Sequence, residues 1–129
     1  MEFMRDIDIK VIPYSQMRYS TVGDYWHDDQ GTHIRIADLG NSKYNFLVAV
    51  HELIECFLLT IAGIKEEDVR AFDEAFEKDE TKDDQAEPGD DPKSPYRWQH
   101  FVAESFERLL AVVLMVDWQE YDKAVRSVK

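Results

Sequence analysis

The hydrophobic pattern changes at Gly40-Asn41-Ser42, and this change constrains the fold more than any other feature of the sequence. Before it, residues 6–12 and 32–37 alternate apolar and polar side chains with a period of two, which is typical of half-buried strands. We expect a hairpin over about 17–38, beside a third strand at about 6–12. Gly40 breaks the sheet, and Asn41 or Ser42 can cap a helix.

Helices are expected in the remainder of the chain. Gly63 suits the left-handed position that follows a helix end, and Ser94-Pro95 is a helix start, with Ser as N-cap and Pro as first residue. The expected helices cover about 43–62, 65–78, 95–115 and 117–127, with an acidic loop at 79–94. This order predicts an α+β fold, a small antiparallel sheet of about three strands with three to four helices packed on one face. At 129 residues the chain suits a single domain, 1–129.

Charge and apolar content limit the classes of partner. The chain has 27 acidic against 15 basic residues, a net charge of −12, so it repels phosphate backbones and we expect no nucleic-acid partner. Residues 66–91 hold thirteen acidic and three basic side chains, typical of a solvated helix face and loop. No uninterrupted apolar run reaches 18 residues, so we expect no membrane span. The lone Cys56 and the lack of a secretory pattern favour the cytoplasm.

The helix at 43–62 carries a histidine and a carboxylate among apolar side chains. His51 and Glu55 are four residues apart, so they share one face, which also bears Leu47 and Leu58. Neither Glu52 nor Glu55 has a Lys or Arg three or four residues away. An unpaired charge in such surroundings is costly. Water, a distant basic residue, a shared proton or a metal must therefore neutralise these groups.

The helix at 95–115 has a second set of the same kind. His100, Glu104 and Glu107 lie within one 60° arc of the helix, at about 100° per residue. Arg108 follows Glu104 at the favoured spacing for an ion pair, whereas Glu107 has no such partner.

Two helices that each carry a His and a Glu one turn apart can face each other. Four ligands then converge: His51, Glu55, His100 and either Glu104 or Glu107. This donor set suits a divalent transition metal, Zn²⁺ and equally Mn²⁺, Fe²⁺ or Ni²⁺. The alternative is that each histidine is a hydrogen-bonded core residue. Asp73 leans toward the core, where it either orients a ligand histidine or bonds a helix end or a tyrosine.

A strand, a short loop and a helix bearing His51-Glu52-x-x-Glu55 resemble the active-site helix of zincin metallopeptidases. Their motif is His-Glu-x-x-His, in which both histidines bind zinc and the glutamate is the general base. The resemblance implies that His51 is a metal ligand and Glu52 the catalytic base. Position 55 departs from the motif, because it is Glu rather than His.

The whole chain also resembles small uncharacterised proteins of bacterial and phage genomes. The shared features are the His-Glu-x-x-Glu helix, Phe72-Asp73, the Glu-Pro-Gly-Asp segment at 87–90, and Pro95-Tyr96 before a helix with His100. This resemblance implies no particular activity.

Three functions are compatible with these patterns. The first is a metal-dependent hydrolase acting on a small-molecule or peptide substrate. The second is a non-enzymatic interaction protein, metal-stabilised or metal-free. The third is a helical Mg²⁺-dependent nucleotide pyrophosphohydrolase, which the histidines disfavour because Mg²⁺ prefers oxygen ligands.

Overall fold

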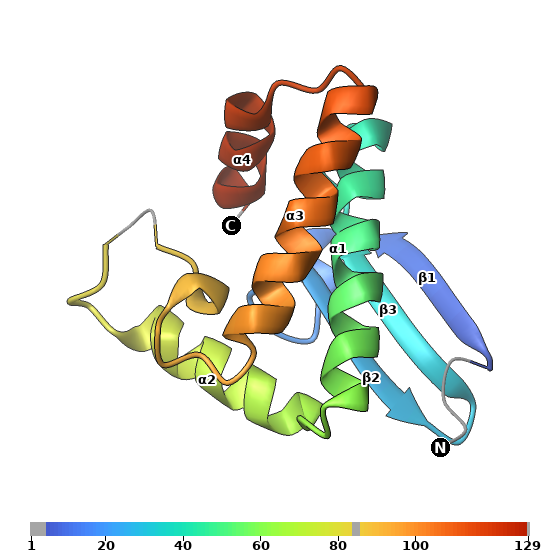
Figure 1. Cartoon of the computed structure of the whole chain (residues 1–129), viewed down its shortest axis with the longest axis vertical. Helices are drawn as coiled ribbons and strands as arrows, with labels where there is room; N and C mark the ends of the chain where they lie inside the picture. The colour runs from blue at the N-terminus through green and yellow to red at the C-terminus, as the bar shows by residue number, and fades with distance from the viewer. Residues whose placement is uncertain (1–4, 84–85, 129) are drawn as a thin grey trace.

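The computed structural model describes residues 5–83 and 86–128. It has an N-terminal sheet followed by four helices (Figure 1), which confirms the predicted α+β class. The strands are β1 (Ile7–Ile12), β2 (Gly23–Asp28) and β3 (Gly31–Ala37). The helices are α1 (Ser42–Ile61), α2 (Glu66–Lys78), α3 (Arg97–Val113) and α4 (Trp118–Ser127), with short 3-10 turns η1 (Tyr14–Gln16) and η2 (Pro88–Asp90).

The sheet is mixed, with strand order β1-β3-β2, and so differs from the antiparallel sheet that the sequence predicts. Strands β2 and β3 form the expected antiparallel hairpin. Strand β1 pairs in parallel with β3, aligning Ile9 with Ile34 and Val11 with Ile36. A period-two pattern reports which side chains share a face but not the direction of the strand, so it could not reveal the parallel pairing.

Helix α1 covers the sheet at β3 and β2 and forms the core with them (Figure 1). The β3 residues Ile34 and Ile36 are fully buried, as are Leu47 and Leu59 of α1. Strand β1 lies at the edge of the sheet, where Ile9 and Val11 remain exposed. The sheet is therefore a platform that fixes α1 in place.

The helix boundaries follow local capping chemistry. The Asn41 side chain accepts hydrogen bonds from the amides of Lys43 and Tyr44 and so starts α1. Gly63 has φ +75°, the left-handed conformation expected after a helix end. Helix α3 begins at Arg97, two residues later than predicted, because Ser94 caps a turn by accepting from the amide of Tyr96. The predicted loop at 79–94 contains η2, and its residues 84–85 lie outside the described residues.

Helices α1 and α3 run antiparallel and pack along each other (Figure 1). Helix α1 is long and apolar enough to cross a membrane, judged by length and composition alone. It also carries the buried Glu55 and packs into the core through Leu47 and Leu59. We therefore interpret α1 as the core helix of a soluble protein.

Candidate metal centre

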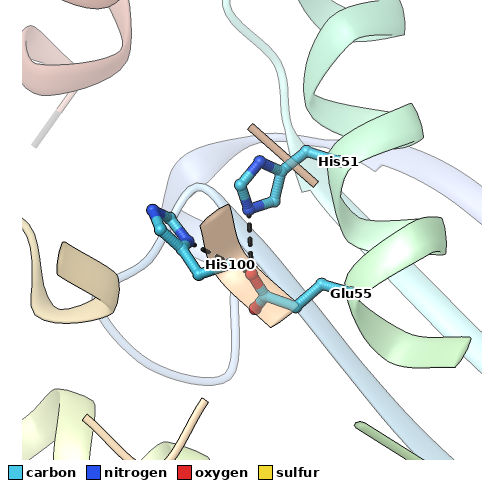
Figure 2. Close-up of side chains that lie close together, drawn as sticks. All are labelled: His51, Glu55 and His100. Carbon is cyan, nitrogen blue, oxygen red and sulfur yellow. Dashed lines mark hydrogen bonds and ion pairs between the residues drawn. The ribbon is translucent and has the colours of Figure 1, made fainter. Parts of the chain in front are cut away.

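Three donor atoms from α1 and α3 converge between the two helices (Figure 2). His51 Nε2 lies 3.0 Å from Glu55 Oε2, and His100 Nδ1 lies 3.1 Å from the same oxygen. The two imidazole rings meet edge to face, with centroids 4.9 Å apart. The one-turn spacing of His51 and Glu55 places both on the α1 face that packs against α3. His51, Glu55 and His100 are thus brought together, as the sequence predicts.

Glu107 is close to the cluster but lies behind it. Its Oε1 accepts a hydrogen bond from His51 Nδ1 at 2.6 Å, on the side of the ring away from Glu55. Its other oxygen accepts from the hydroxyl of Tyr121, on α4. A carboxylate in this position fixes the ring orientation and makes Nε2 the nitrogen that faces the cluster. We therefore assign Glu107 to orienting His51 rather than to binding metal directly.

Glu104 belongs to a second group of possible ligands, which also includes His100. Glu87, Asp90 and Glu104 each offer an oxygen to a second group around this ring, with ligand atoms within 4.8 Å of one another. His100 Nε2 is buried and lies 3.4 Å from Asp90 Oδ1 and 3.8 Å from Glu87 Oε2, without a well-directed hydrogen bond. The second group thus surrounds a ligand histidine with carboxylates, as Glu107 does for His51.

Gly89 explains how the η2 segment reaches His100. A Cβ atom at position 89 would overlap the imidazole ring of His100, so only glycine allows this approach without displacing the ring. The flanking Glu87 and Asp90 are thereby held beside the ring. Neither Glu87 nor Asp90 is among the ligands that the sequence predicts. The glycine between two acidic positions was the available signal.

Glu52 lines the same pocket, one residue along α1 from His51. It lies against Gly23 of β2, where a Cβ would overlap its carboxyl group. Burial, with the nearby charge of Glu55, raises the pKa of Glu52 to about 8. Glu52 is therefore a carboxyl group poised to exchange a proton near neutral pH.

Asp73 bonds tyrosines rather than a histidine. It accepts hydrogen bonds from the hydroxyls of Tyr19, at 3.1 Å, and Tyr96. Tyr96 in turn packs edge-on against His100, with ring centroids 6.1 Å apart. Burial raises the pKa of Asp73 to about 6. Of the two alternatives that the sequence left open, the tyrosine bond is the one observed.

The cluster is strongly charge-coupled in the described structure. Burial alone would raise the pKa of Glu55, but hydrogen bonds from His100 and His51 outweigh it and lower that pKa to about 2. Burial disfavours the charged form of His51, yet the bonds to Glu107 and Glu55 raise its pKa well above the usual value. The same balance, with Asp90 and Glu55 as partners, raises the pKa of His100 to about 10. A metal ion that bound here would therefore compete with protons for these nitrogens.

The cluster opens into a pocket of 430 Å³. Among the described residues, ten with carboxylates line this pocket, and the lysines and arginines in the lining are Lys82 and Arg126. Such a lining attracts cations and repels anions. The pocket thus offers both space for a small ligand and a potential that favours a divalent ion.

The donor set fits a transition-metal ion. Two imidazole nitrogens and one carboxylate oxygen are the protein ligands of catalytic zinc sites of the His₂Glu type. In a tetrahedral site with bonds of about 2.0–2.1 Å, neighbouring ligand atoms lie about 3.3 Å apart. The separations of 3.0 and 3.1 Å from Glu55 Oε2 are close to that spacing. Glu55 and either imidazole are therefore spaced as two ligands of one ion would be.

Compared with protein-family models, curated proteins and solved structures, the chain shows no match.

Proposed function

We propose that this protein is a metal-dependent hydrolase of zincin-like type. In this proposal His51, Glu55 and His100 hold a divalent transition metal, most suitably zinc, and Glu52 is the catalytic base. The observation that carries the proposal is the convergence of His51 Nε2, Glu55 Oε2 and His100 Nδ1 beside a 430 Å³ pocket. Three protein ligands leave a fourth position for water or substrate, as catalytic zinc sites require.

The roles of the residues follow from their positions. A bound zinc ion supplies Lewis acidity and lowers the pKa of a coordinated water to about 7. Glu52 lines the pocket next to the ligands without belonging to the ligand cluster, so in its ionised form it would accept a proton from an attacking water. Glu107 holds His51 in place through Nδ1, and the Asp90 carboxylate lies on the far side of the His100 ring.

The charge of the pocket narrows the substrate class. Ten lining carboxylates disfavour a phosphoester, whose oxygens carry negative charge. Neutral or cationic amides and esters, small molecules or peptides, fit the pocket better. We therefore place carbonyl substrates ahead of phosphoryl substrates.

Glu52→Gln tests the proposal by separating turnover from metal binding. The amide keeps the shape of the side chain but cannot accept the proton. We expect turnover on amide or ester substrates found by a broad screen to fall by about 10²–10⁴-fold, while metal content stays that of the wild type. His51→Ala is the matched control, since it should lose metal and turnover together. Loss of metal from Glu52→Gln would contradict the role of Glu52 as a base.

The second candidate function is a non-enzymatic interaction protein that needs no metal. One observation favours it: both nitrogens of His51 already donate to carboxylates, so this part of the cluster is satisfied by ion pairing alone. In that case metal-loaded and metal-free protein should have the same melting temperature and no hydrolytic activity.

A further inference from the structure

The outer surface of the α1–α3 pair is apolar. We define this outer face by its exposed side chains, which are Phe46, Phe57 and Ile61 of α1 and Trp98, Phe101, Val102, Phe106, Leu109, Val112 and Val113 of α3. Several are exposed far beyond what a folded monomer usually shows, with Trp98 at 68%, Leu109 at 65% and Val113 at 78%. The two helices lie side by side (Figure 1), and on each helix these positions recur at helical spacing, so they form one stripe along α1 and one along α3.

The outer face is large enough to be an interface. A buried aromatic side chain covers about 150–250 Å², so at the observed exposures the face offers on the order of 1,000 Å² of apolar surface. The largest apolar patch of a typical monomer is about 300–600 Å². Each partner in a standard protein–protein interface buries about 800 Å². The apolar area of the outer face thus exceeds that of the largest apolar patch on a typical monomer. It matches the area that one partner buries in a stable interface.

The outer face is also free of carboxylates on α3, although the chain carries a net charge of −12. Helix α3 is described in full, and none of its exposed residues is acidic. Its only two carboxylates, Glu104 and Glu107, line the pocket on the inner side. Two copies of a chain with this net charge repel each other. Contact through the outer face adds no carboxylate of α3 to that repulsion.

We propose that the outer face of α1 and α3 binds a second copy of this chain, giving a two-fold symmetric dimer. A face of uniform apolar character is self-complementary, as an isologous contact requires. Homodimer interfaces are also more apolar than other interfaces. An anionic membrane is a poorer occupant, because an acidic protein without a basic cluster is repelled from its surface. The proposal is independent of the activity of the pocket, which lies on the opposite side of α3.

Light scattering after size-exclusion chromatography tests the proposal over a range of protein concentrations. The wild type should have twice the 15.2 kDa mass of the chain. Leu109→Lys combined with Val113→Lys should weaken association on the order of 100-fold or more, because it buries two charges in the interface. Both positions are well exposed in the monomer, so the circular dichroism spectrum should not change. Trp98→Gln, at the other end of α3, is a second variant with the same expected direction.

Val11→Lys on β1 is the matched control, since Val11 is 48% exposed but lies outside the outer face. It should remain dimeric. Added salt should strengthen the dimer, because it screens the repulsion between two acidic chains. A wild type that is monomeric at all concentrations would overturn the proposal. So would loss of the dimer in Val11→Lys alone, or a monomer that floats with phosphatidylcholine–phosphatidylglycerol vesicles.

Discussion

The inner and outer faces of the α1–α3 pair have the reverse of the usual polarity. The inner face holds Glu55, His100 and Glu107, each less than a tenth exposed. The outer face exposes Trp98, Leu109 and other large apolar side chains. An ordinary surface helix turns its apolar stripe inward and its charges outward.

In our two proposals, each side of α3 binds a partner that the isolated chain does not contain. Buried charges are retained when they are paired or coordinate an ion, and a large exposed apolar patch marks a binding surface. The inner face therefore points to a ligand of positive charge, and the outer face to a protein surface. Each of these conclusions can be tested without the other.

Glu55→Gln should have the largest effect on the inner face. The amide removes the only oxygen of the three-ligand cluster and its negative charge, so we expect metal affinity to fall by more than about 100-fold, measured by competition with a chromophoric chelator. The metal-free protein should also lose about 3–5 kcal/mol of unfolding free energy, because the paired histidines lose their shared counter-charge.

Glu104→Gln is the matched control for this change, since Glu104 lies on α3 near His100 but outside the three-ligand cluster. It should change metal affinity far less. If Glu104→Gln loses more affinity than Glu55→Gln, the metal belongs to the second group, of Glu87, Asp90, His100 and Glu104, instead.

Glu107→Gln should have an intermediate effect. Glu107 accepts hydrogen bonds from His51 and Tyr121 without reaching the ligand cluster. Loss of such a partner typically reduces metal affinity by about 10–100-fold. Competition with the chromophoric chelator measures this loss of metal affinity. A loss as large as that of Glu55→Gln would make Glu107 a direct ligand and contradict the assignment.

The effect most confined to one pH range concerns Asp73, a buried carboxylate of the pocket that bonds tyrosines. Burial raises its pKa from 3.8 to about 6 in the folded protein. Below pH 3.8 the raised pKa contributes fully to the free energy of unfolding. This contribution is lost as the pH rises from 3.8 toward 6, because the carboxyl group then ionises more easily in the unfolded chain. Asp73→Asn has no such proton, so over this range the wild type should lose up to about 3 kcal/mol more unfolding free energy than the variant. Urea unfolding with chelator present measures the difference, and parallel pH profiles would contradict it.

Much of the inner face could be predicted from spacing alone. His51 and Glu55 are one helical turn apart, and the same spacing on α3 indicated a facing partner, so His51, Glu55 and His100 were identified before the fold was known. Neither Glu104 nor Glu107, the two predicted candidates for the fourth ligand, lies in the three-ligand cluster, and the sequence could not predict this. Their placement depends on the relative rotation of two helices, which is set by packing between residues far apart in the chain.

Two features of the fold could not be predicted from local sequence patterns. The parallel pairing of β1 with β3 depends on how the β2–β3 hairpin is placed beside β1. The alternation of apolar and polar residues does not encode that placement. The outer face was missed for a different reason. Trp98, Phe101 and Phe106 have a helical spacing that is typical of core residues, but Trp98 is 68% exposed, because the inner side of α3 is occupied by the charged cluster.

The central claim is that His51, Glu55 and His100 bind a transition-metal ion. Elemental analysis of protein purified without added metal and without an affinity tag tests it most directly. The account predicts one equivalent of transition metal in the wild type, none in His51→Ala, and one in His33→Ala, whose histidine is held by Asp8 and Asp28 on the sheet. Metal-free wild type, or equal metal content in the two histidine variants, would contradict it.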